Sequence, residues 1–210
     1  MKIKLLISVL SLLSPMMSLA QEGSYPKAEV NLGYSFINVH PDIPKITSYN
    51  INGGVASFVY NFSPLWGIKA EFGDYVGNGG AQLKAAGFNG NVSGNFFSYM
   101  FGPQIKKHSG RFQPFGQALF GAAHSGTQAQ LDEIINGLPS SGGSSNNTFA
   151  MEFGGGLDIP VSPHVQIRPV DIDYLYTHFS ANQVSASQNN FKYALGLTIV
   201  WGGGGNGSKK

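Results

Sequence analysis

The sequence predicts an all-β fold, an eight-stranded antiparallel up-and-down transmembrane β-barrel, and three observations lead to this prediction. Residues 191–201, FKYALGLTIVW, alternate strictly between apolar side chains on one parity and small or polar side chains on the other. Seven earlier segments alternate in a similar way, and the connections between successive segments are in turn long and short. Because successive side chains of a strand point to opposite faces, each segment has an apolar face.

The closing segment also distinguishes a membrane barrel from a soluble one. A soluble sheet buries one apolar face as well, so alternation alone leaves both open. On the other parity of residues 191–201, however, Lys192 and Thr198 stand among small residues, and such a face makes a poor water-free core. It suits the lining of a narrow polar barrel whose outside meets lipid. A soluble eight-stranded ligand carrier stays an alternative, which the aromatic residues bordering the apolar face disfavour.

Each expected strand is justified by its own letters. In chain order the strands span residues 27–39, 49–62, 68–76, 93–105, 112–124, 148–159, 165–177 and 191–201. The first four contain EVNLGYSF, ASFVYNF, GIKAEFG and NFFSYMFG, with apolar residues at every second position. In the fifth, Phe115 and Leu119 lie on the parity opposite to Phe120, so the alternation does not decide which of its two faces points inward. The sixth, TFAMEFGGGLDI, alternates throughout.

Two irregularities are expected within these strands. The seventh strand changes its apolar parity at Arg168-Pro169, and proline lacks a ladder N–H, so a bulge belongs there. This bulge leaves Asp171 and Asp173 facing inward. A second bulge is expected at Gly53-Gly54, because the apolar parity differs on its two sides.

The connections follow a regular order. The long ones are residues 40–48, 77–91, 125–147 and 178–190, and the short ones are residues 63–67, 106–111 and 160–164. Short turns at one end and long loops at the other are typical of an outer-membrane barrel with both termini in the periplasm. Short helical turns are expected inside two of the long loops, at residues 81–87 and 131–137.

The N-terminus predicts export from the cytoplasm. Lys2 and Lys4 precede an apolar run, and Ser18-Leu19-Ala20 forms a small-x-small cleavage site before Gln21. We therefore expect a signal peptide at residues 1–20, a barrel domain at 21–201 and a flexible Gly-rich tail at 202–210.

Composition excludes several classes of function. Charged residues make up only 11%, against about a quarter in soluble domains. Without the two lysines of the leader the chain is close to neutral, so no nucleic-acid partner is expected. The chain has no cysteine, which removes disulfides, zinc–thiolate sites and thiol nucleophiles. The five histidines show no metal-ligand spacing and are interpreted as rim residues, so we expect no metal and no cofactor: His40, His108, His124, His164 and His178.

These segments together resemble the OmpA-like outer-membrane β-barrel family, the small eight-stranded barrels of Gram-negative bacteria. The resemblance rests on EVNLGYSF, FQPFGQALFGAA, IRPVDIDYLYTHF and NNFKYALGLTIVW. It implies an integral, monomeric protein of the bacterial outer membrane, in contact with outer-membrane lipids and lipopolysaccharide. Residues 21–201 leave no room for the family's peptidoglycan-binding domain, so cell-wall anchoring is not expected.

The closing strand is similar to the signal that the outer-membrane barrel assembly machinery reads. The residues that match it are Phe191, Tyr193, Leu195, Leu197, Ile199 and Trp201. The chain departs from the pattern because further residues follow the final aromatic, Trp201. Trp201 and other aromatics, including Tyr34, Tyr60, Trp66, Tyr99, Tyr174 and Tyr176, are interpreted as interfacial girdles.

Charged residues on the inner parity form the first candidate site. They are Lys69, Glu71, Glu152, Asp158, Arg168, Asp171, Asp173 and Lys192. A barrel of eight strands has room only for side chains, so we expect a network of salt bridges that fills the interior. The alternative is a charged constriction in a narrow ion-conducting pore.

His178 and Ser180 form the second candidate site. The pair resembles the His-x-Ser of outer-membrane lipid A deacylases, in which the histidine activates the serine as a nucleophile. Asn182 does not directly follow the serine, as that resemblance would require, and a polar rim segment is the preferred interpretation. We therefore expect a non-enzymatic, structural or interaction role with four displayed loops, and a lipid A-modifying hydrolase or an ion pore as the alternatives.

Overall fold

The computed structural model describes residues 25–40, 49–78, 93–125, 147–181 and 184–202 of the 210-residue chain. These residues form a single closed barrel of eight strands. The strands are β1 (Ala28–Val39), β2 (Tyr49–Asn61), β3 (Trp66–Asn78), β4 (Ser93–Lys106), β5 (Gln113–Ser125), β6 (Asn147–Pro160), β7 (Val165–Ala181) and β8 (Val184–Trp201). The predicted fold class is therefore confirmed. Among the described residues, no helix is long and apolar enough to cross a membrane.

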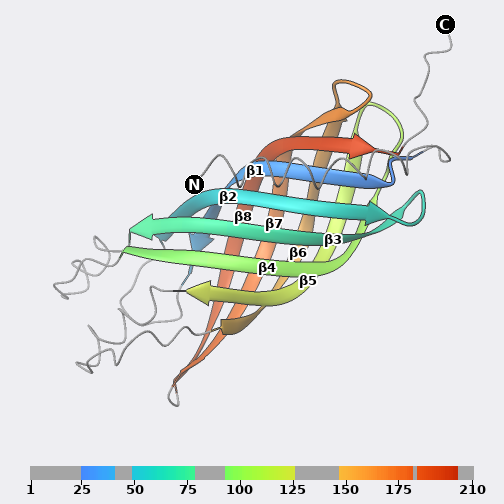
Figure 1. The fold of residues 1–210 in the computed structure, drawn as a ribbon. Coiled ribbons are helices and arrows are strands. Elements are labelled where there is room, and N and C mark those ends of the chain that lie inside the picture. The colour runs from blue at the N-terminus through green and yellow to red at the C-terminus, as the bar shows by residue number, and fades with distance from the viewer. Residues whose placement is uncertain (1–24, 41–48, 79–92, 126–146, 182–183, 203–210) are drawn as a thin grey trace, which may run out of the picture.

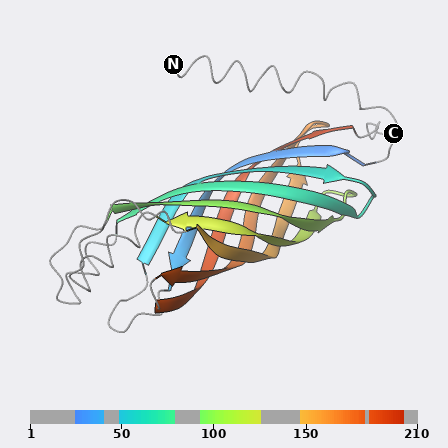
Figure 2. The ribbon, with the colours of Figure 1, turned by 60° about the horizontal axis from the view of Figure 1, so that its bottom comes forward.

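Every strand pairs antiparallel with its neighbours in sequence, and β8 pairs with β1 to close the barrel. Figures 1 and 2 show β1 beside β8, with the strands tilted relative to the axis of the barrel. In the closing pair, Ala28 is opposite Trp201 and Asn38 is opposite Phe191. Closure leaves no sheet edge along the wall, which a surrounding lipid phase requires.

Alternation sorts the side chains between the lumen and the outer surface. Outward residues such as Leu32, Phe72, Phe101 and Leu197 each expose more than half of their surface. Their neighbours on the inner parity, among them Glu71 in β3, are buried. The molecule is thus apolar on the outside, as the surface of a membrane barrel is.

In each of the two shortest described turns, a serine side chain accepts a hydrogen bond from the backbone N–H three residues later. Ser63 Oγ accepts a hydrogen bond from the backbone N–H of Trp66 at 2.9 Å, and Ser162 Oγ accepts one from Val165 at 3.0 Å. In both turns proline follows the serine, at Pro64 and Pro163. Side-chain oxygens of serine satisfy backbone donors that a tight turn leaves free. The Ser-Pro pairs therefore fix the ends of β2–β3 and β6–β7.

One predicted bulge is present and the other is not. The pairing of β7 shifts between Arg168 and Asp171, so both of these side chains are buried while the residues between them face outward. At Gly53-Gly54, however, β2 pairs without interruption with both β1 and β3. The expected bulge there was wrong because Val55 and the apolar residues on the opposite parity give β2 two apolar faces. In such a strand, a change in the parity of the apolar residues does not indicate a bulge.

The connection between β7 and β8 also differs from the prediction. Residues 178–190 were expected to form a loop, but β7 continues to Ala181 and β8 begins at Val184. Ser180 pairs with Ser185, and Phe179 pairs with Ala186. This part of the chain is a hairpin. The helical turns expected at 81–87 and 131–137, the signal peptide at 1–20 and the tail beyond Gly202 lie outside the described residues.

Candidate functional site

The interior of the barrel holds two groups of buried charges. We call them the Lys106 cluster and the Lys192 cluster after their central cations. The Lys106 cluster contains Glu29, Lys106, His108, Asp158, Gln166, Arg168 and Asp171. The Lys192 cluster contains Lys69, Glu71, Gln117, Glu152, Asp173 and Lys192.

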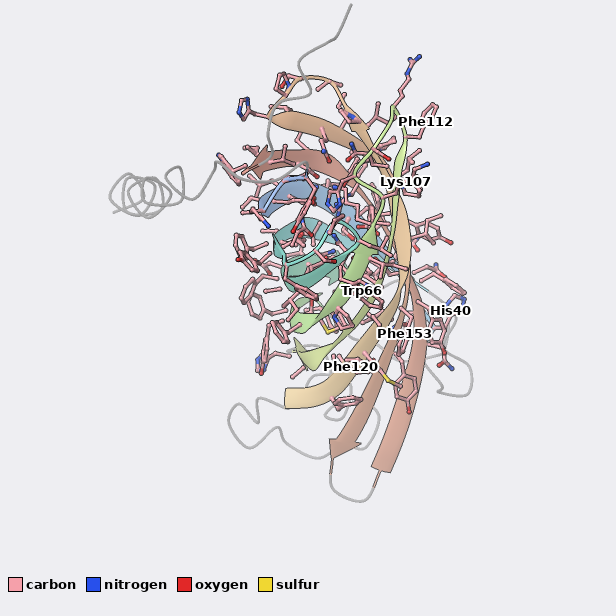
Figure 3. All side chains as sticks on the ribbon, turned by 90° about the vertical axis from the view of Figure 1, so that its right-hand side faces the viewer. His40, Trp66, Lys107, Phe112, Phe120 and Phe153 are labelled. Carbon is pink, nitrogen blue, oxygen red and sulfur yellow. The ribbon has the colours of Figure 1, made fainter. Side chains whose placement is uncertain are left out.

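The Lys106 cluster lies near the end of the barrel that carries the short connections. Lys106 is the last residue of β4, and its ammonium donates to Glu29 at 2.5 Å, to Asp158 at 2.7 Å and to Gln166 at 2.9 Å. Lys107, on the opposite parity, is exposed and points away from the barrel (Figure 3). The three acceptors come from β1, β6 and β7, so one lysine ties four strands together.

Arg168 extends this cluster through a two-pronged contact with Asp158. Its Nε and Nη2 atoms donate to the two carboxylate oxygens of Asp158 at 2.8 and 2.9 Å. Nη1 donates to Asp171 at 3.2 Å, across the bulge of β7. The guanidinium carbon lies 4.1 Å from the centre of the Phe115 ring, which gives the cation an aromatic face. Bidentate pairing of this kind fixes direction as well as charge.

His108 covers the Lys106 cluster from the connection between β4 and β5. Its Nε2 lies 2.9 Å from Glu29 Oε1, and its Nδ1 lies 2.8 Å from the carbonyl oxygen of Pro64. Asn61 donates to the same oxygen of Glu29 at 2.8 Å. The histidine, interpreted from the sequence as a rim residue, is therefore a partner of the interior network.

The Lys192 cluster lies further along the bore. The ammonium of Lys192, in β8, donates to Glu71 and, at 2.6 Å, to Glu152. A third carboxylate, that of Asp173, lies 3.2 Å away. All four side chains are at least 97% buried. Lys192 is therefore the cation that these three acids share, and breaking a buried ion pair of this kind leaves an uncompensated charge.

Lys69 and Gln117 complete the Lys192 cluster from the opposite wall. Lys69 donates to Glu71 at 2.6 Å and to Gln117 Oε1 at 2.7 Å. The amide nitrogen of Gln117 in turn donates to Asp173 at 2.7 Å. Because Gln117 joins a lysine to an aspartate, the contacts form a continuous belt from β3 across β5 to β7.

An apolar layer lies above the two clusters, toward the end with the long connections. It consists of Ile37, Ile51, Tyr75, Phe96, Met100, Leu119, Ala123, Ala150 and Leu175, all buried. The sequence predicts an interior filled by polar side chains, and it gives no sign of this apolar layer. Phe96 and Leu119 belong to strands whose two faces are both apolar, so their inward direction could not be recognised from alternation.

The structure places all eight charged residues named from the sequence inside the barrel, and it divides them between the two clusters. Sequence reasoning missed Glu29, Lys106 and His108. Glu29 has the parity of Asn31 and Ser35, which was a usable signal. Lys106 was assigned to a turn because the end of β4 was set one residue too early. Boundary errors of this size matter most where a charged residue ends a strand.

The second candidate pair lies in the hairpin rather than in a loop. His178 pairs with Phe149 of β6 and with Ser187 of β8, and Ser180 pairs with Ser185. The backbone of both residues thus belongs to β7. On the outside of the barrel, the closing strand exposes its apolar parity, with Phe191, Tyr193 and Leu195 at 45–53%.

Comparison with known proteins gives the family. The profile of the outer membrane protein beta-barrel domain matches residues 6–198. A comparison with curated proteins found no match.

Several solved structures have a similar fold. Neisserial surface protein A superposes with a TM-score of 0.56 at 13% identity, covering 85% of this chain and 99% of its own. The attachment invasion locus protein Ail of Yersinia pestis gives 0.48 at 16% identity, with 83% and 99% covered. Outer Membrane Protein W of E. coli gives 0.45 at 10%, with 86% and 100% covered. At these identities the Neisserial protein supports the fold alone. The profile spans most of the sequence, and the chain therefore belongs to the family of bacterial outer-membrane β-barrel proteins.

Proposed function

We propose that this protein is a monomeric anchor in the outer membrane that displays an interaction surface, with a structural or adhesive role. The observation that carries the proposal is the hairpin at the end of β7 and β8, which we call the projection (residues 179–181 and 184–189). Within the described ranges, these residues pair only between β7 and β8, with residues 187–189 opposite residues 176–178. The last pairs to the flanking strands are Phe149 with His178 and Asn38 with Phe191.

The projection has the properties of a docking edge. A strand that has a partner on one side only presents a row of free backbone N–H and C=O groups on the other. Extended polypeptides bind such edges as an additional strand, and the backbone bonds provide most of the affinity. The letters VSASQN at residues 184–189 are small or polar, so this edge suits water rather than lipid. The proposed partner is an extended segment of another polypeptide.

The interior supports display rather than transport or catalysis. Both charged clusters consist of ion pairs between opposing walls, and the apolar layer adjoins them. A bore filled in this way supplies rigidity. In this proposal both termini and the short connections face the periplasm, the assembly machinery reads the outward residues of β8, and the projection points out of the cell.

The test uses the full protein in lipid nanodiscs and a library of random unstructured peptides. Peptides enriched on the natural protein are measured again on a variant in which residues 179–186 are replaced by Asn-Gly, so that His178 and Ser187 flank a two-residue turn. Asn-Gly favours the type I′ turn of a hairpin, which keeps the rest of the barrel intact. We expect binding to be lost in this variant.

A second pair of variants separates the free edge from the fold. In an antiparallel strand the N–H groups of adjacent residues point to opposite sides, so Ala186→Pro and Ser187→Pro remove donors from different edges. One of the two should weaken peptide binding while the heat-dependent gel mobility of the barrel is kept. Binding that is equal in the shortened variant and the natural protein contradicts the proposal.

A further inference from the structure

Asp74 differs from every other acidic residue that the structure describes. The six others are buried inside the barrel: Glu29, Glu71, Glu152, Asp158, Asp171 and Asp173. Asp74 instead has the outward parity of β3, between Phe72 and Val76, and is exposed. No salt bridge or hydrogen bond of its carboxylate is found among the described residues. A charged side chain on the lipid-facing wall of a membrane barrel carries a cost that grows with depth, so an unpaired one is a candidate functional position.

Asp74 borders a groove in the outer wall. The groove has a volume of about 380 Å³, and its outward-facing lining comes from β1 to β4. Its lining combines the small residues Gly54 and Ala56 with the larger side chains of Leu32, Phe72 and Phe97. A volume near the lower limit of ligand pockets, about 300 Å³, is enough for one chain-like molecule but not for a folded partner.

Gly54 creates the groove. It is the direct cross-strand partner of both Asp74 on β3 and Tyr34 on β1. A Cβ atom built on Gly54 would have no neighbour within 4 Å, so this glycine is not required by a close backbone approach. The missing side chain leaves space beside the carboxylate on an otherwise crowded aromatic surface.

The groove is polar at one end and apolar at the other. Toward the end of the barrel with the long connections the lining includes Asp74. Outside the lining, Tyr34 lies opposite Gly54 on β1, and its hydroxyl donates to Asn52 at 2.7 Å. Toward the middle of the barrel the lining is Leu32, Ala56 and Phe72. This is the polarity of an amphiphile that stands in a leaflet, with its headgroup at the interface and its chain in the hydrocarbon.

We propose that this groove binds one membrane lipid whose headgroup carries a primary ammonium. The hydrocarbon chain lies over Gly54 and Ala56, and the ammonium donates to the carboxylate of Asp74. An ammonium supplies both the opposite charge and the hydrogen-bond donor that Asp74 lacks. An anionic lipid is repelled by the carboxylate. A symmetric second copy of the chain would bring two unpaired Asp74 side chains to the same interface, because isologous contacts use the same surface twice.

The test is native mass spectrometry of the protein released from nanodiscs that contain equal amounts of phosphatidylethanolamine, phosphatidylcholine and phosphatidylglycerol. We expect one retained lipid, with phosphatidylethanolamine favoured about three- to fivefold over phosphatidylcholine, as an exposed ion pair allows. Phosphatidylcholine has the charge but no N–H donor. Asp74→Asn should abolish this preference while a lipid is still retained.

Gly54→Leu should remove the retained lipid, because the new side chain fills the groove without a clash. Its matched control is Gly116→Leu, an outward glycine of β5 whose Cβ would make only ordinary contacts with Ile105 at 3.6 Å. Heat-dependent gel mobility checks that both variants fold. Equal retention of the three lipids by the natural protein, an unchanged preference in Asp74→Asn, or a dimer held through this face overturns the proposal.

Discussion

Among single residues, Lys192 is the buried cation that pairs with three carboxylates at once. Its ammonium serves Glu71, Glu152 and Asp173, and these side chains are buried. Replacing the lysine by methionine keeps much of the volume but leaves three carboxylates without their common partner. We expect Lys192→Met to lower the free energy of unfolding by about 3–5 kcal/mol, the usual cost of removing one member of a buried ion pair.

Urea unfolding of the refolded barrel in detergent measures this loss, with the heat-dependent gel shift as a second readout. Lys107→Met is the matched control, because Lys107 is exposed at the β4–β5 connection and should change stability by less than about 0.5 kcal/mol. The double variant Lys192→Met with Glu152→Gln should recover part of the loss, since it removes one of the stranded charges. Equal unfolding curves for both lysine variants contradict the role assigned to Lys192.

Parity in the sequence was sufficient to recognise the inward charges of strands with one clearly apolar face. Lys69 and Glu71 were found because Ile68, Ala70 and Phe72 mark the outside of β3. Asp74 was missed, although it continues the outward parity, because an acidic residue does not look like part of a lipid-facing row. Which cation meets which acid could not be predicted, since the partners come from strands across the bore.

For the strands, the bulge of β7 gives a sharp prediction about deletions. Between Arg168 and Asp171, β7 has one residue more than β8 has between Gly196 and Ala194. Deleting Pro169 removes that extra residue and leaves the inside–outside alternation intact on both sides. We expect this deletion variant to keep a closed barrel with a heat-dependent gel shift.

Deleting Ile172 is the matched comparison, because no extra residue exists at that position. Tyr174 and the outward residues beyond it would turn into the bore, or the pairing with β8 would slip, since a one-residue shift exchanges the two faces of a strand. We expect this variant to lose the gel shift and to aggregate. If both deletions fold equally well, the inward placement of Arg168 and Asp171 does not depend on the bulge.

The projection shows what alternation cannot predict about a strand. Residues 184–189, VSASQN, contain hardly any apolar side chains, and turn-forming residues dominate there. With no apolar face these residues produce no period-2 signal, so the sequence alone predicts a loop there. Its strand character comes from the register of β7 with β8, which continues beyond the wall without a break.

At the scale of the whole molecule, side chains of the described residues fill the bore at two levels, the charged clusters and the apolar layer. Lys106 and Lys192 join opposite walls through carboxylates, and Phe96 and Leu119 fill the section above them. An eight-stranded barrel filled by side chains has no continuous water path. We therefore expect planar bilayers containing the protein to show no discrete conductance steps, with a large porin in the same bilayer as the positive control.

The double variant Phe96→Ala with Leu119→Ala tests whether the two charged clusters alone are enough to block the passage of ions. It opens the apolar layer but leaves every ion pair of the two clusters in place, so we expect it to remain closed as well. Adding Lys192→Met removes the central cation of the Lys192 cluster but leaves the Lys106 cluster across the bore. We therefore expect the first measurable current only when Lys106→Met is added as well. Discrete steps in the natural protein that change when Glu71→Gln is introduced would instead identify the charged belt as an ion constriction, and the display function would then have to share the barrel with a pore.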